Sequence, residues 1–111
     1  MPIHPTAIVD GSCDIAPDAL IGPYCVIGPR TRLGPGCVLD SHVVIHGHTT
    51  VGERCRFYSH CSVGADPQDL KYRGEETFLR IGDDNVFREF VSLHRGTRGG
   101  HGVTVIGSGN F

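Results

Sequence analysis

The sequence predicts an all-β fold in which very short strands wind into a parallel β-helix of triangular cross-section. Three observations support this. A large apolar residue recurs every six positions, a small residue lies two positions before it, and glycine and proline recur at the two positions after it. Helical periodicity is absent over this stretch, which excludes an all-α fold.

The large and small residues of the repeat are expected to fill the interior together. The large ones occupy eleven consecutive repeats without an exception: Ile3, Val9, Ile15, Ile21, Ile27, Leu33, Leu39, Ile45, Val51, Phe57 and Val63. The small position holds Ala7, Cys13, Ala19, Cys25, Thr31, Cys37, Val43, Thr49, Cys55 and Cys61. Residues two apart in an extended strand point the same way, so both sets face inward. A run this long excludes disorder here.

The 16 glycines and 7 prolines mark turns rather than low complexity. Glycine follows the large residue at Gly22, Gly28, Gly34, Gly52 and Gly64, and the next position holds Pro5, Pro17, Pro23, Pro29 and Pro35. Three strand-and-turn units close a triangle, so each coil takes 18 residues and strands of successive coils stack about 4.8 Å apart. This repeat is typical of hexapeptide-repeat proteins, so we expect a left-handed prism, against the usual crossover rule.

Composition and charge exclude several classes of protein. Ten basic residues against twelve acidic ones give a net charge of −2, which argues against a nucleic-acid partner. No apolar run approaches the roughly 20 residues of a membrane helix, so we expect no membrane insertion. The N-terminus lacks a signal-peptide profile, so we expect a cytoplasmic protein. Five cysteines, all small-position residues without a Cys-x-x-Cys pair, predict buried reduced thiols rather than disulfides or zinc.

The residues that point outward indicate self-association. One face presents Ile8, Val26 and Val44, a second presents Leu20 and Val38 followed by Arg56, and the third presents Asp14, Arg32 and Thr50. Two apolar columns are more than a solitary soluble prism needs. We therefore expect a homotrimer with the polar face toward solvent.

Histidines gather at the turns. Tyr24, His42 and His60 are each 18 residues apart and form a column at one corner, with His46 and His48 nearby. Because one member of the column is a tyrosine and the repeat places no further ligand beside it, we favour solvated or interface histidines over a metal site.

The repeat is interrupted twice. We expect regular coils over residues 1–64, a loop excursion over 65–78, coils over 79–93, a second excursion over 94–103 and a restart at 104–111. Excursions from a solenoid commonly carry function. The first offers Gln68, Asp69, Lys71 and Tyr72 as polar ligand groups, and the alternative is a solvated connector.

At these interruptions the sequence resembles a known family. The motifs are Asp66-Pro67-Gln68-Asp69-Leu70-Lys71-Tyr72, Ile81-Gly82-Asp83, Arg88-Glu89 and Leu93-His94-Arg95-Gly96-Thr97, with His4-Pro5-Thr6-Ala7-Ile8-Val9 and Ser41-His42-Val43-Val44-Ile45 earlier in the chain. They closely resemble the acyl-[acyl-carrier-protein]–UDP-N-acetylglucosamine O-acyltransferases. The resemblance extends over the whole chain.

The resemblance implies the first step of lipid A synthesis. An acyl chain, commonly 3-hydroxylated, moves from the acyl carrier protein to the glucosamine 3-hydroxyl of UDP-N-acetylglucosamine. A histidine acts as general base and a backbone amide stabilises the oxyanion, without metal or organic cofactor. The site lies between neighbouring prisms of a trimer. By motif, Asp69 and Lys71 would contact the nucleotide-sugar, Gln68 and Tyr72 would shape its pocket, and His94 would line the cleft.

The family continues beyond the last residue of this chain, and its general-base histidine is expected beyond Phe111. We therefore expect residues 1–111 to be the N-terminal part of such an enzyme and to be inactive alone. Two alternatives stay open: another hexapeptide-repeat acyltransferase acting on a different nucleotide-sugar, and a non-catalytic trimerising scaffold.

Overall fold

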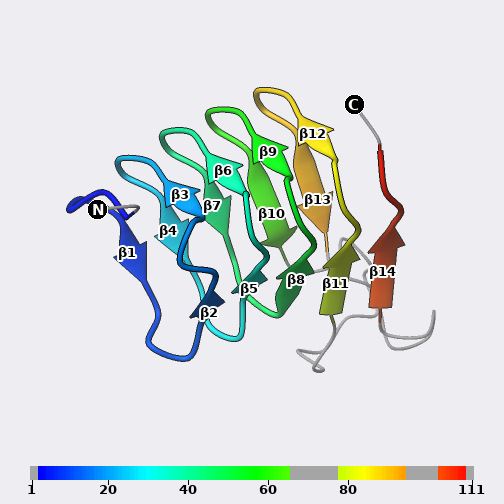
Figure 1. Ribbon diagram of the computed structural model, residues 1–111, viewed down its shortest axis with the longest axis horizontal. Helices are drawn as coiled ribbons and strands as arrows, with labels where there is room; N and C mark the ends of the chain where they lie inside the picture. Colours follow the sequence, from blue (N-terminus) through cyan, green and yellow to red (C-terminus); the bar gives the residue numbers. More distant parts are fainter. Residues whose placement is uncertain (1–2, 66–77, 95–102, 110–111) are drawn as a thin grey trace.

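The computed structural model describes residues 3–65, 78–94 and 103–109, and every regular element in those ranges is a β-strand (Figure 1). The strands are β1 (Ile8–Val9), β2 (Asp14–Ile15), β3 (Leu20–Ile21), β4 (Val26–Ile27), β5 (Arg32–Leu33), β6 (Val38–Leu39), β7 (Val44–Ile45), β8 (Thr49–Val51), β9 (Arg56–Phe57), β10 (Ser62–Ala65), β11 (Phe78–Ile81), β12 (Val86–Phe87), β13 (Ser92–His94) and β14 (Val103–Ile106). The all-β prediction is confirmed.

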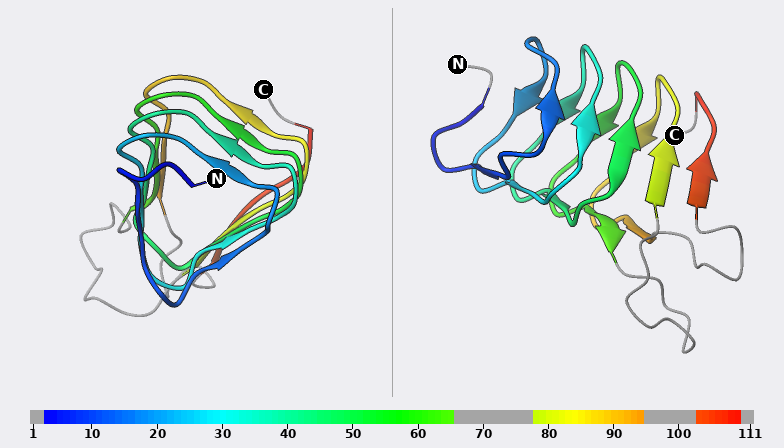
Figure 2. Two further views of the ribbon diagram at one scale, coloured as in Figure 1. Left: turned by 60° about the vertical axis from the view of Figure 1, so that its left-hand side comes forward. Right: turned by 90° about the horizontal axis from the view of Figure 1, so that it is seen from below.

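Every third strand joins the same parallel sheet, and the three sheets form the walls of a triangular prism (Figure 2). The first sheet has the order β1-β4-β7-β10-β13, the second β2-β5-β8-β11-β14, and the third β3-β6-β9-β12. In the early coils paired residues are 18 apart, for example Ile8 with Val26 and Leu20 with Val38. The fold is the predicted left-handed parallel β-helix.

Two interruptions lengthen the repeat without breaking the sheets. Ser62 pairs with Ser92, 30 residues on, which is 12 more than 18. Ile81 pairs with Ile106, 25 residues on, which is 7 more than 18. Strand structure extends to residue 65 and resumes at residue 78, and it extends to residue 94 and resumes at residue 103. The additional residues therefore lie between strands, and the prism continues after each of them.

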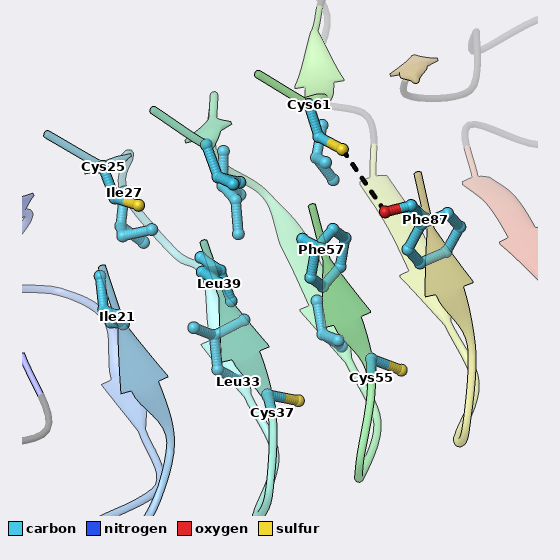
Figure 3. Close-up of a cluster of buried hydrophobic side chains, with 14 of the residues drawn as sticks. Ile21, Cys25, Ile27, Leu33, Cys37, Leu39, Cys55, Phe57, Cys61 and Phe87 are labelled. Carbon is cyan, nitrogen blue, oxygen red and sulfur yellow. Dashed lines mark hydrogen bonds between the residues drawn. The ribbon is translucent and has the colours of Figure 1, made fainter. Parts of the chain in front are cut away.

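The interior is a single apolar column built from the two predicted sets. Figure 3 shows large side chains such as Ile27 and Leu39 stacked along the prism, with the rings of Phe57 and Phe87 4.8 Å apart between centroids. Phe57 has no exposed surface. Burial of each large residue stabilises the fold by about 1.5–3 kcal/mol, which makes this column the main source of stability.

Cysteines at the small interior position donate hydrogen bonds to carbonyls of the next coil. The thiols of Cys25, Cys37 and Cys61 lie 2.9, 3.1 and 3.0 Å from the carbonyl oxygens of Asp40, Gly52 and Arg88. Burial raises the pKa of the Cys25 and Cys61 thiols, which keeps them protonated and able to donate. All five cysteines are free, as the sequence predicts.

The corners of the prism use left-handed backbone at residues other than glycine. In the parts of the chain that the structure describes, eight such residues have positive φ: Tyr24, Arg30, His42, His48, Arg54, His60, Asp84 and Phe90. In the middle coils the amide of this residue donates to a proline carbonyl one coil earlier, as His42 does to Pro23 at 3.0 Å. In the first coil, side-chain oxygens of Thr6 and Ser12 accept the amides of Tyr24 and Arg30 instead. The Asp18 carboxylate accepts the amide of the left-handed Gly36 in the same way. Ladder bonds at every corner offset the cost of the strained backbone.

The outward columns have the predicted composition. Ile8, Val26 and Val44 are in register on the first sheet, and the same column continues with Ser62. The third sheet presents Leu20 and Val38, then Arg56, in register. Ile8 and Leu20 are 66% and 51% exposed, so two walls carry large apolar residues on their outer surface.

Candidate functional site

Both interruptions fall between a strand of the first sheet and the following strand of the second sheet. Residues 66–77 connect β10 of the first sheet to β11 of the second, and residues 95–102 connect β13 to β14 in the same way. The points of departure are neighbours, because Ala65 pairs with His94. The points of return are neighbours too, because Phe78 pairs with Val103. We call this edge, between the first and second sheets, the departure corner.

Of the predicted site residues, Gln68, Asp69, Lys71 and Tyr72 lie outside the described residues. His94 is the last residue of β13, and its backbone pairs with Ala65 at the start of the first interruption. The structure therefore brings together the attachment points of the two predicted site segments.

A turn of the preceding coil lies directly against the departure corner. It runs from His46 to Thr49, the first residue of β8, and leads from β7 into β8. The exposed His46 imidazole places Nε2 3.0 Å from Oγ of Ser62, the first residue of β10. The Leu79 amide, in β11, donates to the His48 carbonyl at 3.0 Å. The turn thus contacts the strands on both sides of residues 66–77.

The His46–Ser62 contact does not follow from the repeat. The two residues are 16 apart, so the 18-residue register does not align them. A signal was present in the outward column of the first sheet, which changes from valine at Val44 to serine at Ser62. That change coincides with the coil in which the first interruption begins.

Gly64 packs tightly on the same turn. Its φ of +74° is in the left-handed region, and a Cβ there would meet the Thr49 Oγ1 atom and lie 3.0 Å from the Gly47 carbonyl oxygen. The Thr49 hydroxyl is itself hydrogen-bonded, since it donates to the Gly47 carbonyl at 2.9 Å. Only glycine suits this position.

The predicted histidine column forms at a different corner, between the third and first sheets. The rings of Tyr24, His42, His60 and Phe90 stack with centroid separations of 5.2, 4.9 and 5.3 Å. The rings oppose one another face to face, an arrangement of stacking and not of metal ligation. Over the described residues, no three His, Cys, Asp or Glu side chains are grouped to hold a metal ion.

Several charged side chains away from the departure corner are paired. Arg54 donates to both carboxylate oxygens of Asp84 at 2.7 and 2.9 Å, and this hydrogen bonding lowers the pKa of Asp84. Arg56 donates to Asp40 at 2.9 Å. The guanidinium carbons of Arg56 and Arg88 lie 4.8 and 4.2 Å from the centroid of the Tyr58 ring. These contacts are solvent-exposed and contribute little to stability.

No helix in the described parts of the chain is long and apolar enough to cross a membrane.

The fold places the chain among the hexapeptide-repeat β-helices, and the known proteins to which it is similar are named as O-acyltransferases. No family model matches the chain. The acyl-[acyl-carrier-protein]–UDP-N-acetylglucosamine O-acyltransferase of Syntrophobacter fumaroxidans is 53% identical over 111 residues, which are 100% of this chain and 43% of that protein. The enzyme of the same name from Xanthomonas euvesicatoria is 53% identical over 109 residues, 98% of this chain and 41% of its own length.

Solved structures show the same relation. LpxA from Acinetobacter baumannii aligns with a TM-score of 0.96 at 52% identity, covering 97% of this chain and 42% of that one. The UDP-N-acetylglucosamine O-acyltransferase of Moraxella catarrhalis aligns with a TM-score of 0.96 at 50% identity and the same coverage. In sequence and in fold the chain is similar to these O-acyltransferases over 97% or more of its length. It spans about two-fifths of the curated relatives, 43% and 41% of the two named above.

The packing at Gly64 predicts that a methyl group added at this position lowers the stability of the fold. We expect Gly64→Ala to destabilise the full-length protein by about 1–3 kcal/mol, because alanine at this φ is strained and its Cβ would displace the Thr49 turn. Gly11→Ala is the matched control, since a Cβ at Gly11 meets nothing within 4 Å. Urea denaturation of both variants measures the difference. Equal stability of the two variants would contradict the described packing.

Proposed function

We propose that the protein containing this chain transfers an acyl group from acyl carrier protein to the glucosamine 3-hydroxyl of UDP-N-acetylglucosamine, the first step of lipid A biosynthesis, in the cytoplasm. The observation that carries the proposal is the 53% identity over all 111 residues to an enzyme named for these substrates. The departure corner supports it, because the residues that resemble the family's nucleotide-sugar motif lie between two strands held by the same turn.

In the proposed reaction the acyl group moves from the thioester sulfur of the carrier protein to the sugar hydroxyl oxygen. The sugar hydroxyl oxygen attacks the thioester carbonyl carbon while a general base takes the hydroxyl proton. The C–S bond then breaks, and the carrier-protein thiol leaves with a proton. We assign the base to a histidine outside these 111 residues, and no metal or organic cofactor takes part.

The substrate contacts are proposed for the segments at the departure corner. Asp69 and Lys71 contact the nucleotide-sugar, Gln68 and Tyr72 shape its pocket, and His94 lines the cleft. The pairing of Ala65 with His94 supports this grouping, because it places the beginnings of the two segments on adjacent strands.

We also propose that the protein is a homotrimer, with the site between neighbouring prisms. The apolar columns of the first and third sheets support this, and these walls meet at the corner where Tyr24 and Phe90 are 60% and 76% exposed. Apolar residues on two different walls suit two different contacts, as a three-fold arrangement requires.

Turnover by the full-length gene product tests the reaction. We expect transfer from 3-hydroxyacyl carrier protein to UDP-N-acetylglucosamine, and much slower transfer to its 3-amino analogue or to an already acylated UDP-sugar. Mass spectrometry of the products distinguishes these acceptors. A strong preference for another nucleotide-sugar would indicate a different acyltransferase. No turnover on any acceptor would contradict the proposed reaction.

Asp69→Ala in the full-length protein should weaken binding of UDP-N-acetylglucosamine roughly tenfold or more, the usual effect of losing a hydrogen bond to a charged group. Calorimetric titration with the nucleotide-sugar measures it. Asp14→Ala is the matched control, because Asp14 is an exposed carboxylate on the polar wall, 3.5 Å from Arg32. If both variants bind like the wild type, Asp69 is not in the site.

A charge on an apolar wall should dissociate the assembly. We expect Leu20→Asp to lower the molecular mass in solution from three chains toward one, since a buried unpaired carboxylate at an interface is costly. Thr50→Asp on the polar wall should leave the mass unchanged. Light scattering coupled to size exclusion measures both. A trimer that withstands Leu20→Asp would mean that this wall is not the interface.

A further inference from the structure

We propose that the turn from His46 to Thr49 is a positioning element for the nucleotide-sugar site, with the His46–Ser62 hydrogen bond as its adjustable contact. The inference rests on the proposed function and adds residues that lie one coil before the predicted substrate segment. Its basis is that one short turn contacts the chain on both sides of residues 66–77.

The first contacts are with β10, where the chain enters the departure corner. His46 Nε2 lies 3.0 Å from Ser62 Oγ, and the His46 amide donates to the Val63 carbonyl at 2.8 Å. Gly64 then lies against Gly47 and Thr49 so closely that a Cβ would not fit. Three consecutive residues of β10 are therefore held by this turn.

The second contacts are with β11, where the chain returns. The His48 ring lies 5.8 Å from the Phe78 ring between centroids, and the His48 carbonyl accepts the Leu79 amide at 3.0 Å. In β11, Leu79 also pairs with Thr49 in β8. The same four-residue turn thus sets the positions of both strand ends from which the segment extends.

Among the contacts with β10, the His46–Ser62 side-chain hydrogen bond lies outside the core. Thr49 is fully buried, whereas His46 is exposed, so His46 can change without a cavity. The outward column of the first sheet is apolar as far as Val44 and changes to serine at Ser62, which is followed in register by Ser92. A histidine bonded to a serine at the entry strand orients β10 without being needed for folding, which is the property expected of a positioning contact.

Kinetics of the full-length enzyme test the proposal. We expect His46→Ala and Ser62→Ala each to raise KM for UDP-N-acetylglucosamine about threefold to tenfold, the size of one lost hydrogen bond, with kcat within about twofold of the wild type. The double variant should be no worse than either single one, because both remove the same bond. His46→Gln, which keeps a hydrogen-bonding group near Nε2, should restore KM.

The matched control is His4→Ala. His4 is also an exposed histidine bonded to a hydroxyl, with Nδ1 2.9 Å from Thr6 Oγ1, but it lies in the first coil. KM should not change in this variant. Additive effects of His46→Ala and Ser62→Ala, or an unchanged KM in an active enzyme, would overturn the proposal.

A readout without substrate separates this proposal from the proposed function. Amide hydrogen exchange of residues 62–79 should be faster in His46→Ala than in the wild type and unchanged in His4→Ala. If the wild type shows no turnover, the proposed reaction fails while this measurement still tests the positioning role. Unchanged exchange in His46→Ala would overturn it.

Discussion

The in-register stacking of successive coils is the constraint on which the rest of the structure depends. Each interior residue must lie on its equivalent one coil earlier, as Ile27 lies beside Val9 and Ile45 beside Ile27. The parallel ladder enforces this, because a slip of one residue would turn the apolar set outward. Additional residues are therefore accommodated only between strands, where 12 are added after β10 and 7 after β13 while the pairing resumes in register.

This constraint also explains why the proposed site lies at one corner. Both added segments follow strands of the first sheet and precede strands of the second, so they emerge in adjacent coils. The residues to which the two segments are attached pair across this ladder, Ala65 with His94 and Phe78 with Val103. A binding site made from segments distant in sequence then requires little further organisation from the segments themselves.

The fold was predictable from the sequence because burial alternates with a fixed short period. Phe57 is large and Cys55 small at the expected positions, and both are buried. Contacts outside that period were not predictable: His46 and Ser62 are 16 residues apart, and the left-handed corner residues include tyrosine and phenylalanine, which give no such signal. A hydrophobic pattern likewise does not predict Asn85, which is buried at a small-residue position and donates to the Gly107 carbonyl at 2.7 Å. Roles for Gln68, Asp69, Lys71 and Tyr72 came only from family resemblance, since polar residues in a connector have no periodicity.

A crystal structure of the full-length protein with bound UDP-N-acetylglucosamine would show whether the departure corner positions the nucleotide-sugar, as we propose. We expect the ligand within contact of residues 66–77 and of His94, on the side of the prism where β10 and β13 end, and facing a second copy of the chain. Ligand bound at the polar wall of Asp14, Arg32 and Thr50, or at the opposite end of the prism, would contradict this proposal.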